Sequence, residues 1–189
     1  MSKKIFCLAL AMMLLVCSVA VAEVLPSRSA KDIVTKYVGD TSAYAEDFAI
    51  NTTDDANGTA QTVLEALAAA AANGPVVNAF GDEVVAALAA LLPEGVDAAT
   101  LDVAELFEIN IANYDSAYGD VLVSFNTLTA ETTVAAVLGC VTADGTAWTA
   151  LKAEVVDGEV VVTFTADAVT AIPEGAETVL AFLNTPVAE

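Results

Sequence analysis

Two segments in the middle of the chain have apolar residues at helical spacing. In residues 59–72 the apolar positions recur every three or four residues, and Asn73-Gly74-Pro75 follows, a sequence that stops a helix. Residues 82–92 repeat this spacing, with Asp82 placed as the N-cap residue. The spacing therefore predicts two helices, at 59–72 and at 82–92.

From residue 104 onward the apolar period falls to two. Phe107, Ile109 and Ile111 alternate with polar neighbours, and residues 121–125 repeat the alternation that is typical of half-buried strands. Residues 134–141 are apolar throughout, which is typical of a central strand covered on both faces. We therefore expect this part of the chain to form a sheet.

Turn signals divide the rest of this half into further strands. Ala143-Asp144-Gly145 predicts a turn into a strand at 148–155, and Asp157-Gly158 predicts a tight hairpin into a strand at 160–164. A last strand is expected at 178–183. Six strands at this spacing predict an α+β protein, with an antiparallel immunoglobulin-like β-sandwich in the C-terminal half and a helical pair before it.

The turn and core residues of this half resemble a known type of module. They are Gly139-Cys140-Val141, Asp144-Gly145, Trp148, Val155-Val156-Asp157-Gly158 and Val160-Val161-Val162-Thr163-Phe164. The stretch resembles the C-terminal immunoglobulin-like β-module of small exported bacterial proteins with no assigned activity. The resemblance covers roughly the last third to half of the chain and implies a fold, because its motifs contain no catalytic residues.

The segment at residues 33–38 fits two structures. Ser29 followed by Asp32, with Gly39 behind, permits a short capped helix. The β-branched and aromatic residues of the segment favour a strand, which we expect to pair with residues 48–50. The strand is preferred, and the helix stays open as the alternative.

The first 22 residues have the pattern of a secretory signal peptide. Two lysines precede an apolar run at 5–16, and the segment ends at Ala20-Val21-Ala22, a small-residue cleavage site. The run is shorter than the roughly 20 residues that cross a bilayer, so we expect cleavage and no membrane insertion afterwards. The alternative, a lipid on Cys17, conflicts with the bulky valine before it. The protein is expected to be secreted or at the bacterial cell surface.

These patterns divide the chain into four segments. They are a signal peptide at 1–22, a leader with edge strands at 23–58, a helical segment at 59–98 and a β-sandwich-like module at 99–189. The 57% of hydrophobic residues argues against disorder, because a disordered chain has too little apolar surface to offset its entropy. We expect residues 23–189 to form one compact domain.

The chain is strongly acidic. It has 26 acidic and 6 basic residues, and cleavage after Ala22 leaves four basic residues against all 26 acids, a formal net charge of −22. No Lys, Arg or His occurs between Tyr37 and Leu151. Such a surface repels phosphate groups, which argues against nucleic acid, nucleotides and anionic membranes as partners. Cations, basic proteins and neutral glycans are compatible with it.

Cysteine and histidine usage removes several kinds of chemistry. After cleavage Cys140 is the only cysteine, so no intramolecular disulfide can form. Cys140 lies in the apolar run 134–141, so we expect a buried thiol. Because the chain has no His to act as a base or as a metal ligand, we expect the thiol to be inert and expect no zinc site.

Asp and Glu are the abundant side chains with catalytic chemistry. The adjacent pairs Glu46-Asp47, Asp54-Asp55 and Asp82-Glu83 could contribute to glycoside hydrolysis, which needs two carboxylates on opposite sides of the bond. Neighbouring residues point apart, so none of these pairs forms such a site locally.

One polar stretch resembles part of a calcium loop. Asp54, Asp55 and Asn57 stand in suitable order before Gly58, but the remaining ligand positions of an EF-hand are not filled. These three residues are the metal-site candidate, with a polar turn leading into the next helix as the alternative. No other cofactor is expected.

The sequence contains no catalytic signature, so we expect an exported, non-enzymatic binding or scaffolding module with a protein or glycan partner. The first alternative is a small-ligand carrier with an apolar pocket between the helical pair and the sheet. The second is a glycosidase-like carboxylate hydrolase with two acids facing each other across a cleft.

Overall fold

The structure, a computed structural model, describes residues 33, 35–52, 58–127 and 130–185. The expected signal peptide and the metal-site candidate lie outside these residues. In chain order the elements are β1 (Thr35–Tyr37), η2 (Gly39–Tyr44), β2 (Ala49–Thr52), α2 (Thr59–Ala71), η3 (Val76–Phe80), α3 (Asp82–Leu91), η4 (Ala98–Thr100), β3 (Asp102–Ala112), η5 (Ser116–Tyr118), β4 (Val121–Phe125), η6 (Ala130–Thr132), β5 (Thr133–Thr142), β6 (Gly145–Val156), β7 (Glu159–Phe164), α4 (Ala166–Thr170) and β8 (Glu177–Asn184), where η marks a 3₁₀-helix.

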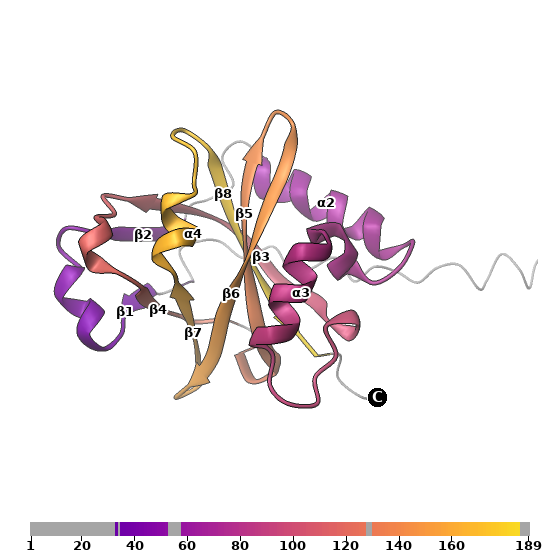
Figure 1. The fold of residues 1–189 in the computed structure, drawn as a ribbon, viewed down its shortest axis with the longest axis horizontal. Helices are drawn as coiled ribbons and strands as arrows, with labels where there is room; N and C mark the ends of the chain where they lie inside the picture. Colours follow the sequence, from indigo (N-terminus) through magenta and orange to yellow (C-terminus); the bar gives the residue numbers. More distant parts are fainter. Residues whose placement is uncertain (1–32, 34, 53–57, 128–129, 186–189) are drawn as a thin grey trace, which may run out of the picture.

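The eight strands join in one antiparallel sheet with the order β1-β4-β7-β6-β5-β8-β3-β2. The sheet curls into a half-barrel, and β1 and β2 form its two edges (Figure 1). The predicted α+β class with a β-rich core is confirmed. The immunoglobulin-like sandwich is not confirmed, because a sandwich consists of two sheets packed face to face, whereas these strands belong to one.

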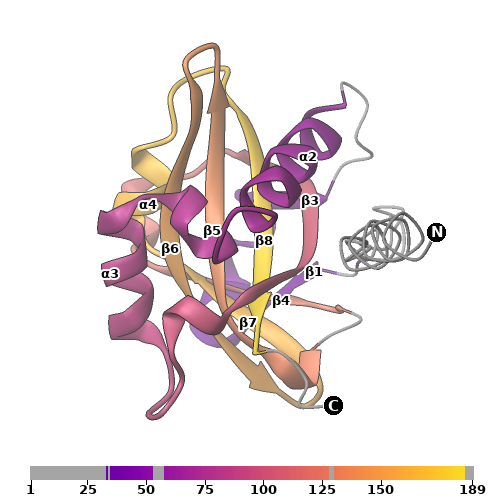
Figure 2. The same ribbon diagram turned by 90° about the vertical axis from the view of Figure 1, so that its right-hand side faces the viewer.

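The two predicted helices are present and cover the outer face of the sheet. α2 packs on β3 and β8, and α3 packs on β6 (Figure 2). Asp82 is not the N-cap of α3: Gly81 occupies that position with φ 88°, and Asp82 lies in the first turn. There its carboxylate is favourable beside the positive end of the helix dipole. In the described parts of the chain no helix is long and apolar enough to cross a membrane.

The continuously apolar segment is a central strand, as predicted. β5 lies between β6 and β8, and its side chains alternate between two cores. Ala136 and Leu138 face the interior of the half-barrel, while Ala135 and Val137 face the helices. Both faces are therefore covered, which explains why the segment shows no polar alternation.

Residues 33–38 contain a strand, but its predicted pairing is wrong. β1 pairs with β4, and β2 pairs with β3, so the two short strands lie at opposite ends of the strand order. The curvature of the sheet brings these edges together. The Tyr37 hydroxyl donates to the Phe48 carbonyl oxygen and accepts from the Ile50 N–H, both at 2.8 Å. The Tyr37 side chain thus joins the two edge strands, β1 and β2, which do not pair with each other.

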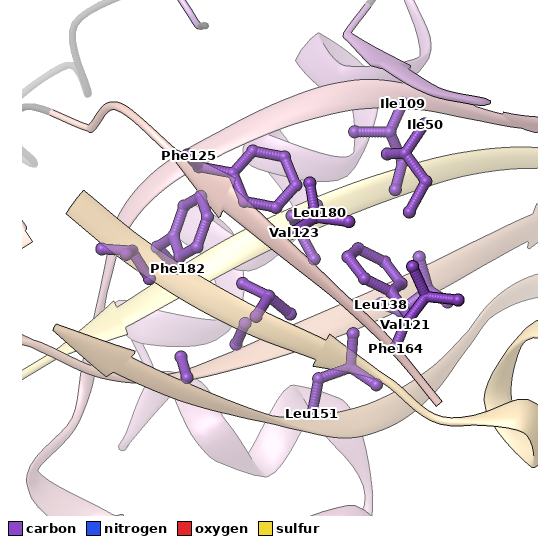
Figure 3. Packing of buried hydrophobic residues seen from close by; sticks show 14 of the residues in the cluster. Ile50, Ile109, Val121, Val123, Phe125, Leu138, Leu151, Phe164, Leu180 and Phe182 are labelled. Carbon is purple, nitrogen blue, oxygen red and sulfur yellow. The ribbon is translucent and has the colours of Figure 1, made fainter. Parts of the chain in front are cut away.

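The interior of the half-barrel is filled by aromatic rings. The Phe125 ring lies with its centroid 5.6 Å from that of Phe182, 6.0 Å from Phe107 and 6.3 Å from Phe164. Figure 3 shows the rings of Phe125, Phe164 and Phe182 among branched aliphatic side chains from several strands. The interior is a packed core rather than an open channel.

Candidate functional site

The predicted acidic pairs are not brought together. Asp54-Asp55 lies outside the described residues, as does Asn57. Glu46 and Asp47 are exposed after η2, and Asp82-Glu83 is exposed at the start of α3 on the other side of the sheet. Across the described ranges no group of three or more His, Cys, Asp or Glu side chains could hold a metal ion. The calcium candidate stays a prediction.

Cys140 is half-buried rather than fully buried as expected. It lies near the end of β5, opposite Ala147 of β6 and Thr178 of β8. Burial raises the pKa of its thiol, so the thiolate is disfavoured at neutral pH. The structure therefore adds no nucleophile to the sequence analysis.

The space between the helices and the sheet contains packed side chains. Val63 and Leu67 of α2 and Leu88 of α3 are buried there, in one cluster with apolar residues of β5 and β8. Trp148 of β6 contacts Phe80 edge to face, with ring centroids 4.9 Å apart. This is the location at which the carrier hypothesis places a ligand pocket.

The interior of the half-barrel ends in polar side chains on one side. After a bulge in β3, Glu105 lies opposite Phe182 and is 5% exposed, and Thr133 lies opposite Asn184. Thr127, also buried, has no hydrogen-bond partner for its hydroxyl in the described structure. Glu105, Thr127 and Thr133 are buried, so a partner has no direct access to them.

The opposite end of the interior holds all four tyrosines of the chain. Tyr37 comes from β1, Tyr44 from η2, and Tyr114 and Tyr118 from the segment between β3 and β4. This segment lies beside β2 and η2 on the left of Figure 1, away from α2 and α3. Tyr44, Tyr114 and Tyr118 are half-exposed.

The rings form a continuous cluster of aromatic contacts. Tyr44 and Tyr118 are stacked with centroids 4.3 Å apart and an interplanar angle of 28°. Tyr118 meets Tyr114 edge to face at 6.1 Å, and both contact Phe48, at 6.1 and 5.6 Å. Phe48 is 1% exposed, so the cluster rests on the buried core.

Hydrogen bonds fix the loop that presents Tyr114 and Tyr118. The Tyr114 hydroxyl donates to the Gly119 carbonyl oxygen at 2.7 Å. The Asp115 carboxylate accepts from the Ala117 N–H at 2.8 Å, which caps η5. The Asp120 carboxylate accepts from the Ala166 N–H at 3.0 Å, which ties the loop to the start of α4. The site is thus built on ordered turns.

Carboxylates surround the rings. Desolvation raises the pKa of Tyr114, and the negative charges of Asp120, Asp115 and Asp167 raise it further. Desolvation likewise raises the pKa of Tyr118, with further contributions from Asp47 and Asp115 and from Tyr44. The local field is therefore negative.

We call this region the tyrosine–aspartate surface. It consists of Tyr44, Tyr114, Tyr118, Asp47, Asp115, Asp120 and Asp167. Half-exposed aromatic rings and carboxylate acceptors are groups that bind a partner, and they include no nucleophile with an adjacent base. The sequence analysis did not identify this surface, although two tyrosines and two aspartates within residues 114–120 were a usable signal.

No protein-family model matches the chain, and neither curated proteins nor solved structures gave a significant match.

Proposed function

We propose that the protein is an exported, non-enzymatic binding module whose partner binds at the tyrosine–aspartate surface. The N-terminal pattern of residues 1–22 supports export. The observation that supports binding is the placement of three half-exposed tyrosines in one cluster, two of them on a turn that is fixed by its own hydrogen bonds.

The distribution of aromatic residues favours this surface over the rest of the molecule. All five phenylalanines of the half-barrel interior are buried, and Trp148 packs under α3 and η3. The tyrosines combine apolar area with a hydroxyl, and such amphipathic rings are enriched at binding interfaces. A surface with few rotatable bonds also loses little entropy when a partner binds.

The proposal has a direct test by solution NMR. The mature chain, isotope-labelled, is titrated with soluble probes of three kinds: neutral oligosaccharides, basic peptides and acidic peptides. We expect one kind to shift amide resonances within residues 44–48, 114–120 and 166–170, the segments that form the surface.

A matched pair of variants gives the control. Tyr44→Ala removes the ring that stacks on Tyr118, and we expect it to weaken binding, so that the same shifts need a higher probe concentration. Val155→Ala changes an exposed apolar residue in the β6–β7 hairpin, and we expect it to leave them unchanged. Shifts that map to α2 and α3 would instead support the carrier hypothesis. The absence of shifts with every probe would refute the proposed binding surface.

Export is tested separately. We expect the intact mass of the protein from its native culture medium to correspond to a chain that begins at Glu23. An acylated chain that begins at Cys17 would show that the signal belongs to a lipoprotein.

A further inference from the structure

We propose that the tyrosine–aspartate surface binds cationic side chains, arginine or lysine, of a basic polypeptide. This inference rests on the proposed function and names the chemistry of the partner. A ring face attracts a cation through its quadrupole, and a nearby carboxylate adds a charge-assisted hydrogen bond. Both kinds of group are present at this surface.

Two of the carboxylates are free to accept a ligand. Asp115 and Asp120 each accept a backbone N–H and hold the loop in place. Asp47 and Asp167, within the described structure, have no hydrogen bond or ion pair from their side chains, and both are exposed. A cation bound beside the rings would therefore find acceptors that no described group already uses.

Within the described residues no cation lies at this surface. The described part of the chain contains two lysines and no arginine. Lys36 pairs with Glu159 at 2.5 Å, and Lys152 pairs with Glu154 at 2.7 Å. No described cation neutralises the negative charge around the tyrosines, and this charge would attract a basic partner from a distance.

The positions of the rings within the cluster indicate where the cation binds. Tyr118 contacts Tyr44 on one side and Phe48 and Tyr114 on the others. Tyr44 has Tyr118 as its ring contact among the described residues, so it forms the outer layer of the stack. The half-exposed Tyr44 ring suits a planar guanidinium, which stacks on aromatic rings and forms paired hydrogen bonds with carboxylates.

A neutral glycan would use the same rings but not the charge. Sugar binding depends on ring stacking and hydrogen bonds, so added salt and the loss of two negative charges would affect it little. Binding of a cation depends on both the ring and the charge. This difference separates the two classes of partner experimentally.

The experiment is a calorimetric titration of the mature chain with a soluble arginine–glycine repeat peptide. Lysine–glycine and glutamate–glycine peptides and a neutral cello-oligosaccharide serve as comparison probes. We expect the arginine peptide to bind most tightly and the glutamate peptide not to bind. We expect its affinity to fall about tenfold or more between ~50 and ~500 mM salt.

The variants separate a specific site from general acidity. Asp47→Asn with Asp167→Asn removes two charges at the surface without changing shape, and we expect an affinity loss of about tenfold. Glu94→Gln with Glu131→Gln removes the same charge from exposed positions elsewhere, and we expect a loss of less than about twofold. Tyr44→Ala should weaken binding by roughly threefold to thirtyfold.

Each outcome has a distinct meaning. Equal losses in the two charge variants would show diffuse attraction and overturn the inference. Salt-independent binding of the oligosaccharide without binding of the basic peptide would overturn the cationic partner and leave the binding surface in place. If no probe binds, both the inference and the proposed function fail.

Discussion

The two faces of the sheet are packed by different kinds of side chain. The interior of the half-barrel contains five phenylalanines, and four of them contact one another. The helix-covered face has small and branched residues on its central strands, such as Ala135, Val137 and Ala181, beneath the aliphatic residues of α2 and α3. A curved sheet encloses a volume that large rings fill, whereas small residues on the outside let helices approach closely.

Because the two faces are packed differently, we expect truncation of a large side chain to lower the free energy of unfolding more in the interior than on the helix-covered face. Phe125 is 0% exposed and contacts three other rings, so Phe125→Ala leaves a cavity that the surrounding strands cannot close. We expect a loss of about 3–5 kcal/mol in the free energy of unfolding, measured by urea titration with circular dichroism. Phe80→Ala, on the helix-covered face with one ring contact, is the matched control and should cost less. An equal or larger loss for Phe80→Ala would contradict the comparison.

The helix-covered face can be tested within α3 alone. Leu88 is 0% exposed, and we expect Leu88→Ala to lower the unfolding free energy by about 2–4 kcal/mol. Leu91, in the same helix, is 37% exposed, and Leu91→Ala should cost less than about 1 kcal/mol. Similar values for both in urea titration would show that α3 does not contribute a specific core.

Close packing on the outer face depends on a glycine. A Cβ at Gly139 would lie 2.7 Å from the Trp148 ring and 2.8 Å from a Val179 methyl group. Gly139→Ala therefore forces the indole or the valine to move, and we expect a loss of about 1–3 kcal/mol in the unfolding free energy. The double variant Gly139→Ala with Trp148→Leu should recover part of it. A neutral single variant would mean that the indole moves aside at no cost.

The closure of the half-barrel also depends on the seam between its edge strands, which is the pair of hydrogen bonds that Tyr37 of β1 forms with the backbone at Phe48 and Ile50. Tyr37→Phe leaves the Ile50 N–H and the Phe48 carbonyl without the hydroxyl that joins them. We expect a loss of about 1–2 kcal/mol, together with faster hydrogen exchange of the Ile50 amide. Tyr114→Phe removes a hydroxyl that bonds within its own loop and should leave that exchange rate unchanged. Unchanged exchange in Tyr37→Phe would show that the seam does not need the hydroxyl.

The strands β1, β4 and β7 use polar contacts on their outer side. Ser124 is 1% exposed and donates to Glu159, which also pairs with Lys36. The hydrogen bonds from Lys36 and Ser124 hold the Glu159 pKa below its usual value. Because the folded pKa is the lower one, this stabilisation is present above the unfolded pKa and is lost as the pH falls through the folded pKa.

Of the changes considered, loss of the Lys36–Glu159 pair is expected to have the smallest effect on stability. Between about pH 5 and pH 3 we expect the urea midpoint of the native chain to fall slightly more than that of Lys36→Met. Lys152→Met, which removes the exposed pair with Glu154, is the charge-matched control and should behave as the native chain does. A pH profile of Lys36→Met that matches the native one would show that the Lys36 pair adds nothing to stability.

Local patterns in the sequence were enough to predict the elements. The apolar spacing identified α2 and α3 to within a residue or two, the alternation identified β3 and β4, and turn signals placed β6, β7 and β8. The continuous apolar run correctly predicted the central position of β5. Asp157-Gly158 correctly predicted the β6–β7 turn, where both residues have positive φ. These features depend on neighbours along the chain, which a single sequence displays.

Which strands pair was decided by the tertiary structure. Both a sandwich and a half-barrel need strands with the same alternation, so the pattern cannot distinguish two sheets from one. The pairing of β1 with β4 and of β2 with β3 follows from the curvature of the whole sheet, since its edges must meet around a filled interior. The same closure gives Tyr37 its role of joining the two edge strands by a hydrogen bond, which its position in a short strand does not suggest.

The sequence by itself determined the helices, most strands, the acidity and the lack of histidine chemistry. Only the tertiary structure decided that Tyr44, Tyr114 and Tyr118 meet, because pairing of Ala49 with Ala112 brings the segment after η2 beside the β3–β4 turn. Contacts between residues so distant in the chain depend on strand order and sheet curvature, which no local spacing of residues encodes.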